Sequence, residues 1–331
     1  MIQDRIGRSL TALRVSVIDR CNLRCTYCMP ADVFNKNYTY LKPDEILTFD
    51  EIQTVVQSAM NLGVRKIRLT GGEPLLRPKL WDLVKKIKSL GIEEIALTTN
   101  GLLLEEQAAA LYGAGLDRVT VSLDTLNPPL FQKMSGTSVS IQKVLRGLKA
   151  AQEIGFLNIK VNAVIQRGVN ENEILSLAHF ARTEGLHLRF IEFMDVGHTN
   201  HWSKDQVVPG QEILEALKKQ WTLLPLAPSK NHVAREWIYE DGSGKVGFIN
   251  SVSEAFCGGC DRGRLTADGL FYTCLFSAKG LDLKSSLRDS HDVVVLTELM
   301  AAQWLQREDR YSELRAEMNE QPRIEMSRMG G

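Results

Sequence analysis

The chain has 331 residues, with 40 basic and 40 acidic side chains, so it carries no formal net charge. This balance argues against a general attraction to nucleic acid or to an acidic membrane, although it permits a local basic pocket. Hydrophobic residues make up 44% of the chain, which is enough for a globular core. No stretch reaches the roughly 18 apolar residues of a membrane span, and the first residues lack the apolar segment of a secretory signal. The expected location is the cytoplasm.

Strands and helices are expected to alternate through the first two thirds of the chain. Short β-branched runs predict strands at 13–18, 66–70, 94–99, 118–123, 159–165 and 188–194. Apolar residues at helical spacing predict helices at 50–62, 78–90, 102–115, 141–154 and 171–184. Such alternation is typical of parallel βαβ units, arranged as an α/β incomplete (β/α)6 TIM-like barrel or as a wide open sheet.

The pattern changes after about residue 200. Segments 221–226, 233–239 and 246–249 are typical of short antiparallel strands, and a helix is expected near 291–305. We therefore divide the chain into a partial barrel over 1–220 and a C-terminal region over 221–331. In parallel α/β folds the ligand site lies at the carboxyl ends of the strands, where the unusual motifs of this chain also fall.

The cysteines form two groups of three. The groups are Cys21, Cys25 and Cys28, and Cys257, Cys260 and Cys274. In a reducing compartment such groups favour metal or cluster ligation over disulfides. Three thiolates can hold three corners of a [4Fe–4S] cluster and leave one iron open. A zinc site completed by a distant histidine is the alternative, although His198 and His201 lack a metal-binding spacing and we interpret them as loop residues.

The first cysteine group reads C-x₃-C-x₂-C, with Tyr27 before the last cysteine, and Gly71-Gly72-Glu73-Pro74 follows the second expected strand. These motifs resemble the radical S-adenosylmethionine (SAM) superfamily. The resemblance implies that SAM chelates the open iron, and that an electron from the cluster cleaves it to methionine and a 5'-deoxyadenosyl radical. The implied SAM-binding residues are Tyr27, Gly72, Ser122 and Met194.

The second cysteine group reads C-x₂-C-x₁₃-C, with R-x-R directly behind its second cysteine, and the chain ends in Gly-Gly. These features resemble the GTP 3',8-cyclase family of molybdenum cofactor biosynthesis. The resemblance implies a second [4Fe–4S] cluster that binds the guanine of GTP, and abstraction of H3' to give (8S)-3',8-cyclo-7,8-dihydroguanosine 5'-triphosphate. It implies catalytic roles for Arg14, Gly330 and Gly331. The implied GTP contacts are Arg14, Lys66, Arg68, Thr99, Lys160, Arg189, Arg262, Gly263 and Arg264.

Physical chemistry supports several of these roles independently, because basic residues occur on strands that are otherwise apolar. A cation buried there without a partner would be costly, and a triphosphate would offset that cost. The alternative is that these side chains point outward or pair with carboxylates. Asp261 and Gly263 depart from the family pattern, since relatives have a neutral polar and a larger apolar residue there. A carboxylate near a triphosphate is unfavourable unless it points away or pairs with an arginine.

The resemblance also implies partners. Cyclic pyranopterin monophosphate synthase would act next, a low-potential flavodoxin or ferredoxin would supply electrons, and a homodimer is compatible with it; no nucleic acid or membrane partner is expected. One rival is a peptide-modifying radical SAM enzyme, which usually has more C-terminal cysteines and no R-x-R or Gly-Gly tail. The other is a zinc-stabilised binding protein without catalysis, which metal analysis would distinguish.

Overall fold

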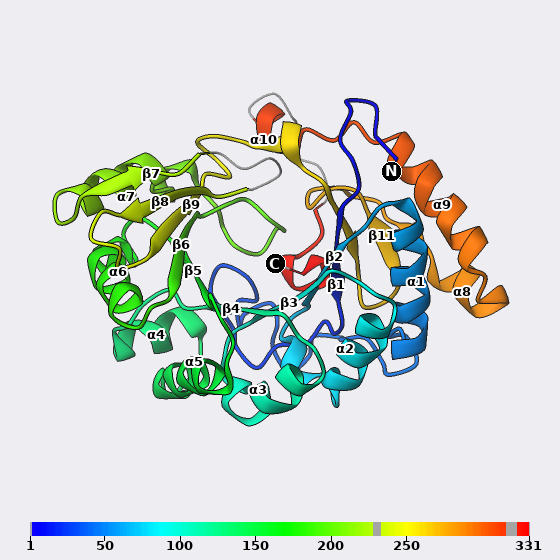
Figure 1. Ribbon diagram of the computed structural model, residues 1–331, viewed down its shortest axis with the longest axis horizontal. Coiled ribbons are helices and arrows are strands. Elements are labelled where there is room, and N and C mark those ends of the chain that lie inside the picture. Colours follow the sequence, from blue (N-terminus) through cyan, green and yellow to red (C-terminus); the bar gives the residue numbers. More distant parts are fainter. Residues whose placement is uncertain (1, 228–232, 316–322, 331) are drawn as a thin grey trace.

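Six parallel strands form the centre of a single sheet in the computed structural model (Figure 1). The structure describes residues 2–227, 233–315 and 323–330. The six strands are β1 (Ala12–Ser16), β2 (Lys66–Thr70), β3 (Glu94–Thr99), β4 (Arg118–Ser122), β5 (Lys160–Ile165) and β6 (His187–Glu192). Each pairs with the next strand along the chain, and all six coincide with strands expected from the sequence.

Helices connect these strands and cover the outside of the barrel (Figure 1). They are α1 (Phe49–Leu62), α2 (Leu80–Ser89), α3 (Leu104–Gly113), α4 (Pro128–Ser135), α5 (Gln142–Ile154), α6 (Ile174–Thr183) and α7 (Gly210–Lys218). The sequence analysis did not predict α4 and α7, which begin at Pro128 and Gly210. Proline is tolerated there, since the first turn has no intrahelical use for its missing N–H.

The C-terminal strands extend both edges of the same sheet. On one side β10 (Arg262–Leu265) pairs in parallel with β1, followed by β11 (Leu270–Tyr272) and β12 (Leu281–Asp282). On the other side β9 (Lys245–Ile249) pairs in parallel with β6, followed by β8 (Arg235–Tyr239) and β7 (Leu223–Pro225). The barrel is not closed, so the expected incomplete α/β barrel with antiparallel C-terminal strands is confirmed. The division at residue 220 stays a prediction.

The two faces of the central strands carry different chemistry. Side chains alternate along a strand, and the register sets Arg14 beside Arg68 on β2 and Arg264 on β10. The intervening residues Leu13 and Ile67 are at most 1% exposed and pack in the apolar core beneath the helices. A register slip of one residue would exchange these faces, so the apolar core fixes the polar lining of the interior.

Helices α8 (Lys284–Ser290) and α9 (Val293–Leu305) lie on the outside, where α9 packs against α1 (Figure 1). Trp304 on α9 is fully buried, and its indole N–H donates to the carbonyl of Arg8 over 3.1 Å. The guanidinium of Arg307 lies 4.4 Å from the centre of that ring and also donates to the carbonyl of Cys260. Among the described residues, no helix combines the length and apolar character needed to cross a membrane.

Replacing Trp304 should therefore destabilise the fold far more than replacing its neighbour. We expect Trp304→Ala to lower the free energy of unfolding by about 3–5 kcal/mol, because it opens a cavity and removes a buried hydrogen bond. Leu305 is 51% exposed, so Leu305→Ala should change the free energy of unfolding by about 0.5 kcal/mol or less. Anaerobic denaturant titrations of both variants test this, and equal effects would contradict the packing role of Trp304.

Candidate active site

The first cysteine group lies on the long loop between β1 and α1. The amide of Cys28 donates to the carbonyl of Cys25 over 3.0 Å, and the amide of Leu23 donates to the sulfur of Cys21 over 3.4 Å. Burial raises the pKa of Cys21 to about 11 and that of Cys28 to about 12. Burial also raises the pKa of Cys25, and the nearby thiols of Cys28 and Cys21 add to the shift. These three partly buried thiols raise one another's pKa and resist joint ionisation unless a cation binds them, so the donor set fits an iron–sulfur cluster.

The double glycine after β2 lies directly against the start of the cysteine loop. The amides of Gly72 and Glu73 donate to the carbonyls of Ile18 and Arg20, each over 2.8 Å. A Cβ on Gly71 would lie 2.5 Å from the oxygen of Ile18, and one on Gly72 would lie 2.3 Å from the oxygen of Arg20. Only glycine allows the two backbones to approach this closely.

Glu73 connects this motif to the end of β3. Its buried carboxylate accepts from the hydroxyl of Thr99 and the amide of Asn100, each over 2.7 Å, and from the amide of Leu75 over 3.0 Å. The side-chain amide of Asn100 donates in turn to Asn22 on the cysteine loop over 2.7 Å. Burial raises the pKa of Glu73 to about 7, although these bonds favour its ionised form. The hydroxyl of Thr99, an expected GTP contact, therefore points to Glu73.

The expected SAM-binding residues share one end of the barrel. Tyr27 and Gly72 lie on loops that follow β1 and β2, while Ser122 ends β4 and Met194 follows β6. The hydroxyl of Tyr27 donates to Asp124 over 2.6 Å, which ties the cysteine loop to the carboxyl end of β4. This arrangement places all four around the carboxyl ends of the parallel strands.

Basic side chains line the interior face of the strands. Burial lowers the pKa of Arg14 well below its usual range, and the guanidinium groups of Arg264, Arg262 and Arg68 lower it further. Burial and neighbouring cations lower the pKa of Arg68 and of Arg264 to about 10 and that of Lys160 to about 7. These shifts mark a concentration of positive charge that an anion would relieve.

Arg118 belongs to the same face and was missed in the sequence analysis. It pairs with Glu94, while Arg189 pairs with Glu236 over 3.1 Å, and these two carboxylates neutralise part of the charge. The buried Nε atoms of Arg118 and Arg189 have no hydrogen-bond partner within the described part of the chain. The signal in the sequence was an arginine, Arg118, at the start of an otherwise apolar strand. Lys66 is exposed at the amino end of β2, on the face that carries the buried cations.

The second cysteine group lies at the other end of these strands. Cys257 and Cys260 precede β10, which runs parallel to β1, and Cys274 follows the antiparallel β11. Burial alone would raise the pKa of Cys260, but Arg262 and Arg307 outweigh it and bring the value to about 6. Burial raises the pKa of Cys274 to about 11, and the nearby Cys260 contributes. Partly buried thiols beside cations again form a donor set that fits a cluster.

The structure places Asp261 and Gly263, the two residues that the resemblance singled out. The carboxylate of Asp261 accepts a hydrogen bond from the hydroxyl of Thr11, so it is held at the start of β1. Gly263 pairs with Leu13 on the face opposite the arginines, and a Cβ there would lie 2.7 Å from the ring of Phe271. A larger residue would therefore require the ring to move.

The C-terminal tail enters the barrel. In Figure 1 the end of the chain, in red, lies within the barrel opening beside β1 and β2. Arg264 donates to the carbonyls of Gly330 over 2.6 Å and Met329 over 3.3 Å. Gly330 has a φ of 72°, and a Cβ on it would lie 2.2 Å from the methyl carbon of Thr70. Gly331 lies outside the described residues, so its expected role stays a prediction.

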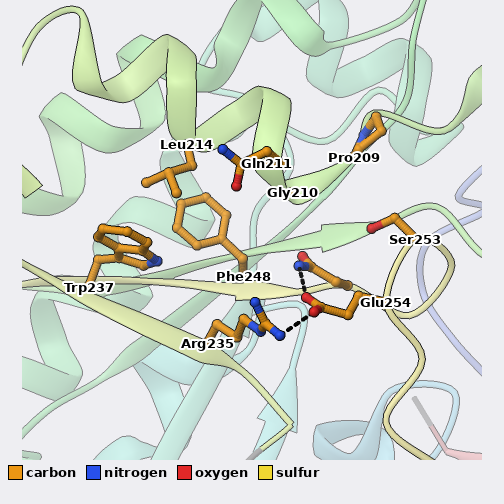
Figure 2. Close-up of a pocket in the computed structure, with 10 residues that line it drawn as sticks. Pro209, Gly210, Gln211, Leu214, Arg235, Trp237, Phe248, Ser253 and Glu254 are labelled. Carbon is orange, nitrogen blue, oxygen red and sulfur yellow. Dashed lines mark hydrogen bonds and ion pairs between the residues drawn. The ribbon is translucent and has the colours of Figure 1, made fainter. Parts of the chain in front are cut away.

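Two other features lie outside this site. Figure 2 shows a cavity of about 350 Å³ near α7 and β9, bordered by Trp237, Phe248 and the ion pair of Arg235 with Glu254, and none of the predicted site residues line it. Within the described ranges, no three His, Cys, Asp or Glu side chains group closely enough to hold a single metal ion. The ring of His198 instead accepts a hydrogen bond from the amide of Arg323 over 2.6 Å.

Comparisons with known proteins agree with this geometry. Residues 15–181 match the family model "Radical SAM superfamily", and residues 186–313 match "Molybdenum Cofactor Synthesis C". The structure of SuiB from Streptococcus suis bound to S-adenosylmethionine shares the fold, with a TM-score of 0.64 at 14% identity over 94% of this chain and 68% of that one. The chain is thus a radical SAM protein, a class that implies SAM and a [4Fe–4S] cluster.

Curated relatives define the family within that class. A GTP 3',8-cyclase of Acidothermus cellulolyticus is 49% identical over 95% of this chain and 89% of its own length. A GTP 3',8-cyclase of Xanthomonas axonopodis pv. citri is 47% identical over 100% of this chain and 99% of its own length. A third, from Aquifex aeolicus, is 46% identical over the full length of both chains. The chain belongs to the GTP 3',8-cyclase family, enzymes of molybdenum cofactor synthesis.

The close contact at Gly72 gives a direct test of the SAM end. We expect Gly72→Ala to weaken SAM binding at least ~10-fold, because the added methyl group must push the cysteine loop away from β2. Gly113→Ala is the matched control, since a Cβ there meets nothing within 4 Å. Equilibrium SAM binding and iron content of both reconstituted variants provide the measurement. Unchanged binding in Gly72→Ala would refute the proposed packing constraint.

Proposed function

We propose that this chain binds GTP inside the partial barrel and converts it to (8S)-3',8-cyclo-7,8-dihydroguanosine 5'-triphosphate. The observation that carries the proposal is the excess of buried positive charge on the interior face, which Glu94 and Glu236 neutralise only in part. A triphosphate supplies several negative charges, and guanidinium groups bind phosphate oxygens bidentately. The proposed contacts on the interior face are Arg14, Lys66, Arg68, Arg118, Lys160, Arg189, Arg262 and Arg264. Thr99 and Gly263 lie on the opposite face of their strands, so their expected GTP contacts rest on the resemblance alone.

The first cysteine group would hold the cluster that binds SAM. When bound, this cofactor pair would supply a 5'-deoxyadenosyl radical, which would take the hydrogen atom at C3' of GTP. The C3' radical would then bond to C8 of guanine at the expense of the C8=N7 π bond, and one electron and one proton would reduce the remaining base radical, so that the product is an isomer of GTP. The protein contributes placement: Gly72 and Glu73 fix the cysteine loop, and Tyr27 ties it to β4. Ser122 and Met194 complete the proposed SAM contacts.

The second cysteine group would hold the second [4Fe–4S] cluster and bind the guanine end of GTP. Its position at the amino end of β10 supports this role, because the buried cations then lie between the two cysteine groups. Arg264 would bind both the tail carbonyls and the substrate. Arg14 and the tail glycines would lie nearest the reacting sugar, where the tail helps to exclude water.

The remaining implications concern partners. We propose a low-potential flavodoxin or ferredoxin as electron donor and cyclic pyranopterin monophosphate synthase as the next enzyme. The proposed location is the cytoplasm, the proposed assembly is a homodimer, and no nucleic acid or membrane partner is proposed.

The test uses anaerobic holoenzyme with reconstituted clusters, dithionite, SAM and GTP deuterated at C3'. We expect 5'-deoxyadenosine that carries deuterium. The new nucleotide should have lost the deuterium of C3' and should have the elemental composition of unlabelled GTP. Deoxyadenosine without deuterium would refute abstraction at C3'. Deoxyadenosine that forms equally without GTP would refute GTP as the substrate.

Lys160 gives the proposal a pH dependence. Burial and the cations of Arg189 and Arg118 lower the pKa of its amine to about 7, although Glu236 acts in the opposite direction. Binding of a triphosphate favours the charged amine and must raise that pKa. GTP binding at pH 8 should therefore take up a proton, and affinity should fall by up to ~10-fold per unit as pH rises above 7.

Calorimetric titration of the holoenzyme in buffers of different ionisation enthalpy measures this uptake. Lys160→Arg keeps the charge and should bind GTP without the additional proton, whereas Lys160→Met should lose both the affinity and the uptake. The same proton uptake in wild type and Lys160→Arg would assign the effect to another group.

A further inference from the structure

Asp195 lies where three separate parts of the chain meet. It follows Met194 after β6 and is 4% exposed. Its carboxylate accepts from the hydroxyl of Tyr311 over 2.6 Å, from Nε of Arg315 over 2.9 Å and from Nη1 of Arg323 over 2.9 Å. The backbone carbonyl of Asp195 accepts a further bond from Arg323 over 2.7 Å. One buried carboxylate therefore fixes three side chains of the C-terminal region.

One of these contacts leads to the second cysteine group. Tyr311 on α10 (Tyr311–Leu314) stacks on Phe276, with ring centroids 4.2 Å apart and planes inclined by 23°. Phe276 follows Cys274 by two residues, and its backbone amide bonds to that cysteine. Arg315 also donates to the carbonyl of Ser251 over 3.3 Å. The carboxylate of Asp195 thus supports the loop that carries Cys274.

Another contact leads to the tail. Arg323 precedes Glu325, whose carboxylate accepts from the amide of His198 over 3.0 Å and the hydroxyl of Thr199 over 2.9 Å. The helix α11 (Met326–Met329) follows at once and ends at Gly330 inside the barrel. The loop after β6 therefore holds the base of the tail, and Arg264 holds its end.

We propose that Asp195 is a positioning residue for the reaction, which places the C-terminal tail through Arg323 and the Cys274 loop through Tyr311 relative to the SAM end of β6. It acts through these groups and does not itself touch the reacting atoms. The inference rests on the proposed function for its effect on product formation. Its effect on the tail depends on this structure alone.

A buried ion network can also serve stability only, so the test needs a matched control. Glu192 is the last residue of β6, three residues before Asp195, and is 1% exposed. Its carboxylate accepts from the amides of Gly210, Val252 and Ser253 over 2.8 to 2.9 Å. None of these partners belongs to the tail, so Glu192→Gln disturbs an equally buried carboxylate without releasing the tail.

The experiment compares Asp195→Asn, Arg323→Met and Glu192→Gln in reconstituted holoenzyme. Carboxypeptidase release of the C-terminal residues, followed by intact-mass spectrometry, reports tail placement without any substrate. We expect release to be ~10-fold faster or more in Asp195→Asn and Arg323→Met, because a charged hydrogen bond of the tail is lost. Glu192→Gln should match wild type. Arg323→Met leaves Tyr311 and Arg315 bound to Asp195, so it tests the tail contact even where Asp195→Asn fails to fold.

Product coupling is the second readout. Asp195→Asn should keep forming 5'-deoxyadenosine while nucleotide product per deoxyadenosine falls ~10-fold, and Asp195→Glu should restore part of it. Combined with removal of the last two residues, Arg323→Met should add no further loss of coupling, because both changes act through the tail. Asp195→Asn should add a further loss to the truncation, because it also releases Tyr311 beside the Cys274 loop. Additive losses from Arg323→Met and the truncation, or wild-type protection of Arg323→Met from carboxypeptidase, would overturn the proposal. A loosened tail in a protein that never converts GTP would instead refute the proposed function alone.

Discussion

The structure depends on how charge is buried inside the partial barrel. Arg14 lies beside Arg68 and Arg264 on adjacent strands, where burial and neighbouring cations lower the pKa of all three guanidinium groups. Such a lining is costly, and the apolar residues that alternate with it must offset the cost by packing under the helices. The strand register therefore satisfies two demands at once. It places the apolar core between the strands and the outer helices, and it concentrates positive charge on the interior face, where an anionic ligand can bind.

The same register sets the two cysteine groups apart. The first follows the carboxyl end of β1, and Cys257 and Cys260 precede the amino end of the parallel β10. A five-residue strand spans roughly 16 Å, so one donor set lies at each end of a cation-lined interior. In the proposed function SAM binds at the first end, and GTP extends from the second end along the cations, because its base and its phosphates need different partners.

Local sequence signals predicted the central strands and the cysteine motifs well. They failed where distant segments decide the outcome: the pairing of β10 with β1 and of β9 with β6 joins residues far apart in the chain. The alternation of side chains between the two faces of a strand bears on two further differences between the expected and the observed site. Thr99 lies on the face opposite Thr98, so its hydroxyl meets Glu73, whereas Thr98 accepts from Arg68 over 2.9 Å. Arg118 shares the cationic face, but one arginine at a strand start carries little information by itself.

The tail shows how the end of a chain can be ordered within a site. Ordering each of its residues costs about 1–2 kcal/mol of backbone entropy, so a single contact would not hold it. Met329 is fully buried, Arg264 binds the last carbonyls, and Glu325 is bonded to the loop after β6. Because Asp195 begins that loop beside Met194, the contacts that order the tail also fix it relative to the SAM end of the barrel. Order in the tail and order at the SAM end are therefore linked through one short segment of backbone.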